Sequence, residues 1–321
     1  MITAYLFTAG SIYPNPIDES QPLPAGAVWI DLLNPTPEEV RKVDAALKIV
    51  LPSREEMAEI EFSSRIYQED GAVYLTATVI TRADTEQPES TPITFVLAGH
   101  VLITMRYAEP QPFRTFATQI VRHPSLNTSG EAALSNLLDT IIDRVADVLE
   151  RIHKEVDGIS NGVFAQNKGQ RLDYESILKR IGKSQTLTSK ARDSLVSLGR
   201  ILSFVGRPGE TKQEKALARN LATLSRDVMS LSDHATYLSN NISFLLDATL
   251  GLISSEQNGI IKIFSVAAVV FLPPTLIASI YGMNFHFMPE LDWVWGYPLA
   301  IIVMIMSAVL PYWFFKRRRW L

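Results

Sequence analysis

Two apolar runs near the C-terminus constrain this chain more than any other feature. The runs are Ile263–Tyr281 and Tyr297–Phe315, and neither contains a charged side chain. As a helix, each run is roughly 28 Å long, which is about the thickness of the hydrocarbon core of a bilayer. Residues 282–296 form only a short connection, so the runs predict a transmembrane hairpin. A buried hairpin of a soluble protein is the alternative, and the length of the runs and the basic end of the chain argue against it.

The charges that flank the hairpin predict its orientation. The connection contains Glu290 and Asp292 and no Lys or Arg, whereas the chain ends in a basic tail, residues 316–321. The basic residues of this tail are Lys316, Arg317, Arg318 and Arg319. The positive-inside rule places the C-terminus in the cytoplasm, and two crossings return the N-terminal part to the same side. With Lys262 the tail forms either a basic collar around an inner pore mouth or an anchor in lipid, and both roles stay open.

The composition excludes several classes of protein. A length of 321 residues allows a sizeable core besides the membrane segments, and a net charge of −4 gives no electrostatic footprint for nucleic acid. The absence of cysteine excludes disulfides, thiol catalysis and cysteine metal sites. The start of the chain, Met1–Phe7, lacks the basic region and long apolar core of a signal peptide. We therefore expect the N-terminal part to stay in the cytosol.

The first 125 residues predict an α+β domain of αβα-like type, a mixed sheet covered by helices. Their β-branched and aromatic content favours strands. The predicted strand regions are Met1–Thr8, Ala27–Leu33, Arg65–Gln68, Ala72–Arg82 and Ile93–Arg106. Turn chemistry is present at Asp70-Gly71 and at Gly99-His100.

Three helices are predicted in the same region. One begins at Pro35 and continues to about Ile49, because proline and acidic residues are favoured in the first turn. Another begins after Ser53, whose capping box is completed by Glu56. The third covers Phe113–Arg122.

Long helical patterns follow. Residues 126–210 predict an antiparallel pair of long helices, of which the second covers Tyr174–Phe204. A third helix begins near Thr211 and meets no proline before residue 273, so it can continue to Tyr281, on the order of 105 Å. Its apolar stripe follows heptad spacing at Leu221, Leu224, Val228, Leu231, Ala235, Leu238, Ile242, Leu245, Thr249 and Leu252. So long a helix needs neighbours, which are either the chain's own long helices or identical chains.

These patterns divide the chain into seven segments. The cytosolic ones are an α/β domain, a helix pair and a stalk at residues 1–125, 126–210 and 211–259. The first span, outer loop, second span and tail follow at residues 260–281, 282–296, 297–315 and 316–321.

No catalytic constellation is present. Gly158-Ile159-Ser160-Asn161-Gly162 matches the nucleophile elbow of hydrolases, but it lies in a helical run without the strand that this chemistry requires. There is no phosphate-binding loop of the G-x-x-x-x-G-K-[ST] type, and the five histidines form no i, i+4 pair. The sequence predicts neither an enzyme nor an organic cofactor.

One face of the first apolar run carries polar side chains. Its members recur at helical spacing: Asn258, Ile261, Ser265, Leu272, Thr275 and Ser279. Such a face indicates either helix packing or the lining of a narrow pore built by several copies of the chain. Pro273-Pro274 on the same run indicates either a packing kink or a carbonyl exposed to the pore.

The loop between the runs carries a resemblance. Tyr281-Gly282-Met283-Asn284-Phe285 followed by Met288-Pro289-Glu290-Leu291 resembles the CorA family of divalent-cation channels, whose signature is Gly-Met-Asn at the outer end of the first span. The resemblance implies a funnel-shaped homopentamer in the bacterial inner membrane that takes up Mg²⁺, and often Co²⁺ and Ni²⁺. It also implies closure of the channel by cytosolic Mg²⁺.

The resemblance further implies roles for individual residues. Gly282, Met283 and Asn284 are the expected outer selectivity ring. The matching pore positions are Asn258, Ile261, Phe264, Leu272 and Thr275. The polar face contains four of these positions and has Ser265 in place of Phe264. Asp227 and Asp233 are the candidate regulatory Mg²⁺ ligands, although exposed acidic residues need no special role.

Two alternative functions remain open. A ZntB-like zinc transporter belongs to the same superfamily, but that branch is expected to carry Ile at the position of Met283. A membrane-anchored helical scaffold without transport is the other alternative. Asn284 and the polar helix face argue against a scaffold.

Overall fold

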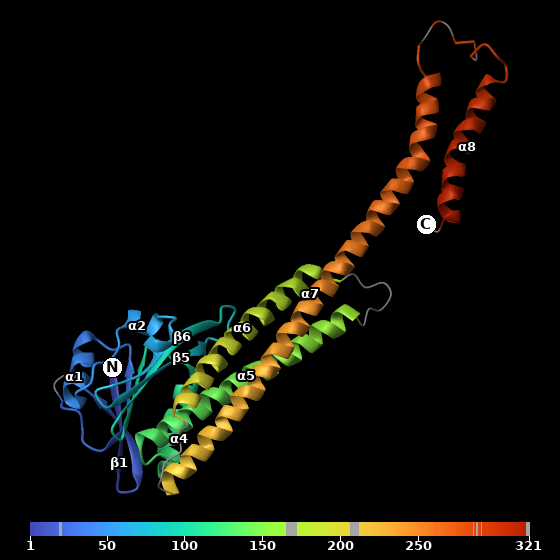
Figure 1. The fold of residues 1–321 in the computed structure, drawn as a ribbon. Coiled ribbons are helices and arrows are strands. Elements are labelled where there is room, and N and C mark those ends of the chain that lie inside the picture. Colours follow the sequence, from blue (N-terminus) through green and yellow to red (C-terminus); the bar gives the residue numbers. More distant parts are fainter. Residues whose placement is uncertain are drawn as a thin grey trace. The chain divides into compact units, whose positions relative to one another are not determined.

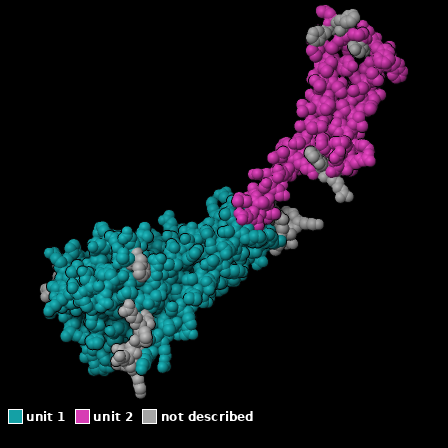
Figure 2. Space-filling model, viewed as in Figure 1, with its two compact units in different colours: residues 1–246 teal, residues 247–321 magenta. Residues whose placement is uncertain are grey.

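The structure is a computed structural model that describes residues 1–18, 21–164, 172–205, 212–284, 286, 288–289 and 291–318. The chain forms two compact units, residues 1–246 and residues 247–321 (Figure 2). The first contains a sheet and most of the helices, and the second contains two apolar helices. A single helix, α7 (Lys212–Tyr281), belongs to both units.

The sheet has seven strands in the order β2-β1-β3-β7-β6-β5-β4. The strands are β1 (Ile2–Thr8), β2 (Ser11–Ile17), β3 (Ala27–Leu33), β4 (Ile66–Glu69), β5 (Ala72–Thr81), β6 (Glu89–Ala98) and β7 (Val101–Arg106). Only the β3–β7 pair is parallel among them. The predicted turn at Asp70-Gly71 joins β4 to β5, and both of its residues have positive φ.

Strand β2 was not predicted, whereas the run Ile93–Arg106 divides into two strands at the predicted turn, Gly99-His100. Pro14 and Pro16 lie within β2, which is an edge strand paired only with β1. Proline is tolerated at a sheet edge because its missing N–H is not needed there by a second neighbour. The run of residues 93–106 divides at Gly99, whose φ of +60° closes the β6–β7 hairpin.

Helices cover both faces of the sheet (Figure 1). On one face, Val43 of α1 (Pro37–Leu47) and Met57 of α2 (Arg54–Ala58) join the core with Ile30 and Leu32 of β3. On the other, Trp29 of β3 contacts the rings of Phe113 and Phe116. Both phenylalanines belong to α4 (Gln111–Arg122). The α+β domain with helices on both faces is therefore confirmed.

The helix starts agree with the capping chemistry. Ser53 accepts a hydrogen bond from the N–H of Glu56 (3.2 Å), and the Glu56 carboxylate accepts one from the N–H of Ser53 (2.7 Å). Thr36 and Glu39 form the same capping box at α1, which begins two residues later than the predicted start at Pro35. Two further short helices are α3 (Phe62–Arg65) and the 3₁₀ helix η1 (Pro124–Leu126).

Three long helices complete the first unit. They are α5 (Gly130–Phe164), α6 (Tyr174–Val205) and the first part of α7, which lie alongside one another in Figure 1. Eight of the ten heptad positions of α7 are buried, and Leu231 and Leu252 are partly buried. The Gln185 amide donates to Ser239 Oγ across α6 and α7 (3.2 Å), and Phe164 stacks on Phe244 across α5 and α7. Within the first unit, the chain's own helices thus cover the predicted stripe as far as Leu245.

The second unit is a helical hairpin. It consists of the end of α7 and of α8 (Gly296–Arg317), which extends the predicted second span by one residue at its start and two at its end. Both helices are long and apolar enough to cross a membrane. Almost none of the side chains in their apolar stretches is buried in the single chain, as expected of helices that face lipid or other subunits.

Candidate ion pathway

The Gly-Met-Asn segment directly follows the last turn of α7. The N–H of Gly282 donates to the carbonyl oxygen of Ala278 (3.0 Å), and the N–H of Met283 donates to that of Ile280 (3.3 Å). A Cβ atom at residue 282 would lie 3.1 Å from the Ala278 oxygen, so glycine suits this close helix end. Met283 and Asn284 are exposed. Phe285 and Glu290 lie outside the described residues.

The five pore positions implied by the resemblance all lie on α7, and all are exposed. The apolar members are largely exposed, with Ile261, Phe264 and Leu272 at 61%, 72% and 65%, as are Ile263 and Phe271 elsewhere on the helix. Large apolar side chains left open in this way require a partner surface or lipid. The single chain does not enclose a pore around them.

The hydroxyl groups on this helix are bonded within the helix itself. Thr275 Oγ1 donates to the Phe271 carbonyl oxygen (2.7 Å), and Ser265 Oγ donates to that of Ile261 (2.8 Å). Each hydroxyl oxygen keeps acceptor capacity for a hydrated ion. Pro273 and Pro274 lie inside α7 without ending it, and they leave the carbonyl oxygens of Val269 and Val270 without their usual N–H partners.

The basic residues gather at the end of the hairpin opposite Asp292. Lys316 and Arg317 form the last turn of α8, Arg318 caps it, and Arg319 lies outside the described residues. Lys262 is partly buried on α7. The Arg317 guanidinium lies over the Trp313 ring, with Cζ 5.3 Å from the centroid, and that of Arg318 lies over Phe314 at 5.5 Å. Cation–π contacts therefore position both guanidinium groups.

The two candidate regulatory residues lie in different surroundings. Asp227 on α7 faces Asp139 and Asp143 on α5, whereas Asp233 lines an open groove of about 520 Å³ between α6 and α7. Burial raises the pKa of Asp139, and the negative charges of Asp143 and Asp227 raise it further. No group of three His, Asp or Glu side chains in the described part of the chain is arranged to hold a metal ion.

The acidic residues on α5 were missed in the sequence. Burial raises the pKa of Asp143, and the charges of Asp147 and Asp227 add to the effect. Asp139, Asp143 and Asp147 are spaced four residues apart, which places them on one helix face. This spacing could have predicted an acidic helix face from the sequence, but only the fold shows that Asp227 faces it.

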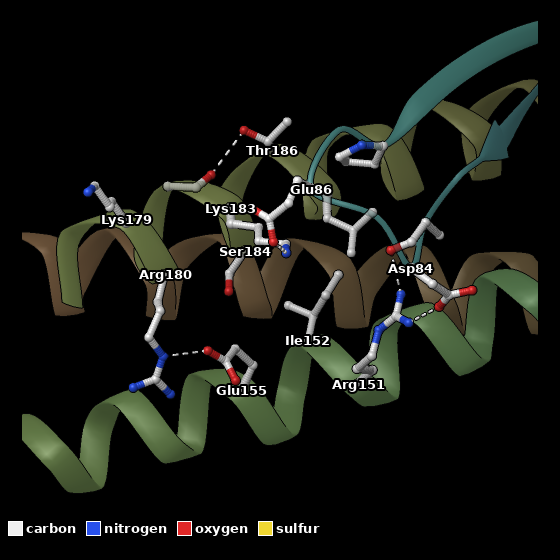
Figure 3. A pocket seen from close by; sticks show the side chains of 14 residues that line it. Asp84, Glu86, Arg151, Ile152, Glu155, Lys179, Arg180, Lys183, Ser184 and Thr186 are labelled. Carbon is white, nitrogen blue, oxygen red and sulfur yellow. Dashed lines mark hydrogen bonds and ion pairs between the residues drawn. The ribbon is translucent and has the colours of Figure 1, made fainter. Parts of the chain in front are cut away.

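A pocket of about 680 Å³ lies between the β5–β6 connection and helices α5 and α6 (Figure 3). Its charged side chains are paired. Arg180 Nε lies 2.6 Å from a Glu155 oxygen, Lys183 Nζ lies 3.0 Å from a Glu86 oxygen, and Arg151 pairs with Asp84. These ion pairs link the β5–β6 connection to the long helices, and none of the pocket's lining residues is a pore position.

The family model and the relatives in sequence indicate one family, and a solved structure shares the fold. The family described as "CorA-like Mg2+ transporter protein" matches residues 24–317. The chain is 34% identical to the "Magnesium transport protein CorA" of Escherichia coli (strain K12) over 326 aligned residues, covering all of both chains. It is 33% identical to the protein of that name from Wolinella succinogenes, covering 92% of each. The solved "CorA magnesium transporter from Methanocaldococcus jannaschii" superposes with a TM-score of 0.77 at 18% identity, covering 100% of this chain and 99% of that one.

Proposed function

The chain belongs to the CorA family of Mg²⁺ transporters, and on that premise we propose that it is a homopentameric channel for Mg²⁺ uptake across the bacterial inner membrane. Each subunit contributes α7 to the pore wall and Gly282, Met283 and Asn284 to the outer mouth. Both termini face the cytoplasm. The protein is a transporter and not an enzyme.

The exposed pore face of α7 carries this proposal. Asn258, Ile261, Phe264, Leu272 and Thr275 are all open in the single chain. One hairpin cannot enclose a pathway, so the face acquires its function only when several copies of α7 surround a common axis. Asn258 and Thr275 then form polar rings, and the three apolar residues form constrictions that close the pore by dewetting.

Hydration chemistry explains why a neutral ring suits Mg²⁺. This ion gives up its water ligands reluctantly. Amide oxygens of Asn284 and nearby backbone carbonyls accept hydrogen bonds from the bound waters without removing them, whereas a carboxylate ring would hold the dication too firmly. Asp292 and Glu290 raise the cation concentration outside. The membrane potential supplies about 4.6 kcal/mol for two charges at 100 mV.

We propose that cytosolic Mg²⁺ closes the channel through acidic residues of the first unit, with Asp227 and Asp233 as ligands. The surroundings of Asp227 fit a hard dication, because the charges of Asp143 and Asp227 add to burial in raising the pKa of Asp139. A cation there would relieve this repulsion. Mg²⁺ commonly binds through one or two carboxylates and keeps several waters. A three-ligand cage is therefore not required.

The test is ion flux into liposomes that contain the purified Asn284→Ala variant. We expect Mg²⁺ uptake to be abolished while the variant assembles as the wild type does, because the ring loses its acceptors but the helices are unchanged. Asn240→Ala, which changes another exposed asparagine of α7, is the matched control and retains flux. Undiminished Mg²⁺ uptake by Asn284→Ala would contradict the proposal that Asn284 forms the outer mouth of the pore.

Ion preference is tested in the same liposomes with Mg²⁺, Co²⁺, Ni²⁺ and Zn²⁺ supplied separately. The Met283 side chain at the proposed mouth supports the Mg²⁺ branch, and we expect Mg²⁺ uptake to exceed Zn²⁺ uptake. Greater Zn²⁺ uptake by the wild type would favour the ZntB-like alternative. Absence of flux for all four ions would favour the scaffold.

A further inference from the structure

We propose that the groove between α7 and α8 binds an anionic phospholipid, with an acyl chain in the groove and the phosphate on the guanidinium groups of Arg317 and Arg318. The inference goes beyond transport. It relies on the proposed function only for the position of the end of α8 at the cytoplasmic leaflet.

The groove is apolar and open to the surroundings of the hairpin. It has a volume of about 480 Å³, within the range of small-molecule sites. Val269 of α7 forms one wall and is 39% exposed. The other wall belongs to α8 and consists of Leu310, Pro311, Trp313, Phe314 and Phe315. Such a surface suits an acyl chain.

Two of the aromatic side chains that line the groove also contact the guanidinium groups of the two arginines. Trp313 and Phe314 line the groove, and their rings carry the guanidinium groups of Arg317 and Arg318 at 5.3 and 5.5 Å. The apolar groove is therefore continuous with a doubly cationic end. Guanidinium groups present two parallel N–H donors that match a phosphate.

Within the described part of the second unit, residues 247–318, no carboxylate pairs with the cationic end. Neither Arg317 nor Arg318 forms an ion pair with a carboxylate among the described residues. Beyond Glu256, the only acidic residues of this unit are Glu290 and Asp292 in the connection at the other end of the hairpin. A phosphate diester on an acyl-bearing ligand supplies the missing charge.

This charge pattern favours a lipid over a second copy of the chain. The apolar runs Ile263–Tyr281 and Tyr297–Phe315 contain no acidic residue. A neighbouring helix in the groove would fill the apolar part and leave both guanidinium groups unneutralised. Phosphatidylglycerol offers acyl chains and a net negative head group together, whereas phosphatidylcholine carries its own compensating cation.

The test is native mass spectrometry of the full-length protein, titrated with phosphatidylglycerol or with phosphatidylcholine of the same acyl chains. We expect tighter binding of phosphatidylglycerol. Arg317→Gln combined with Arg318→Gln is expected to lower its apparent affinity by about 25-fold, since each basic side chain at an anionic surface contributes roughly fivefold. Arg122→Gln with Arg219→Gln removes two exposed guanidinium groups from the first unit and should keep the preference.

A second variant separates the groove from a simple basic anchor. Val269→Trp fills the groove and leaves every basic side chain in place. It should weaken phosphatidylglycerol binding, while the oligomer mass in the same spectra stays that of the wild type. Wild-type binding by Val269→Trp, or equal binding of the two lipids by the wild type, would overturn the proposal. So would efficient disulfide formation between copies of Leu310→Cys, which would place a second chain over the groove. Mg²⁺ flux is measured separately, so lipid binding lost with flux intact leaves the transport proposal standing.

Discussion

A buried ion pair anchors the α/β unit at the scale of single residues. Arg106 Nε donates to Asp31 Oδ1 (3.0 Å), and its Nη2 donates to Oδ2 (2.7 Å). Thr104 also donates to Asp31, and Trp29 donates to Thr104, so the pair belongs to a satisfied network. The Arg106 guanidinium lies over the Phe113 ring at 4.8 Å, which joins the network to α4.

Removal of one member of this pair should be costly. Arg106→Met leaves the Asp31 carboxylate buried without its partner, and we expect about 3–5 kcal/mol of destabilisation. The double change Asp31→Leu with Arg106→Met leaves no buried charge and should recover most of the loss. Urea-induced unfolding of the full-length protein in detergent measures the free energy of unfolding of the single and the double variant. Equal destabilisation by the single and double variants would contradict this account.

At the scale of elements, the acidic face of α5 gives a pH dependence with a defined sign. The pKa of Asp139 is raised in the folded protein above its usual value of 3.8. The folded state therefore binds this proton more readily than the unfolded state, and the free energy of unfolding decreases as pH rises through the raised pKa. Ionised Asp139 is thus unfavourable at neutral pH, and the penalty disappears toward pH 3.8.

Asp139→Asn should consequently stabilise the protein at pH 7. The Asp139 carboxylate is only partly desolvated by its neighbours and the side chain keeps contact with water, so the gain is expected to stay below about 1 kcal/mol and to vanish as the pH approaches 4. Added Mg²⁺ should raise the thermal unfolding midpoint of the wild type more than that of the variant. Asp193→Asn on the exposed surface of α6 serves as the control. A stabilisation that persists unchanged at pH 4 would rule out the electrostatic cause.

The elements also show what a sequence can and cannot specify. Periodicity over many turns predicted α7 closely, because each apolar residue of the stripe indicates the same buried face. The polar and Gly-Pro segments on either side delimited α6. Strand β2 escaped notice because its prolines contradict strand propensity and only its edge position makes them tolerable. Asp227 lies opposite α5 because of tertiary packing, which no local sequence pattern predicts.

At the scale of the whole molecule, the proposed pathway depends on assembly. The polar face of α7 could be read from the sequence, yet in one chain it surrounds nothing. The selectivity ring likewise remains a prediction, because one subunit shows only the exposed Met283 and Asn284.

The expected assembly is a pentamer. Native mass spectrometry should give a mass five times that of the 35.8-kDa chain. The Asn284→Ala variant should give the same mass, because that residue lies beyond the helices that associate. A monomer in a membrane-like environment would exclude the proposed pore.

The two prolines of β2 acquire a further meaning in such an assembly. Five tethered sheets would meet at a high effective concentration, and a bare sheet edge invites intermolecular strand pairing. Pro14 and Pro16 occupy alternate positions of the outer strand, so they remove successive N–H donors along the same side of that edge. The opposite edge, β4, is only four residues long. In the proposed pentamer, both borders would thereby be protected against fusion into a continuous sheet, and neighbouring subunits would stay free to move against one another.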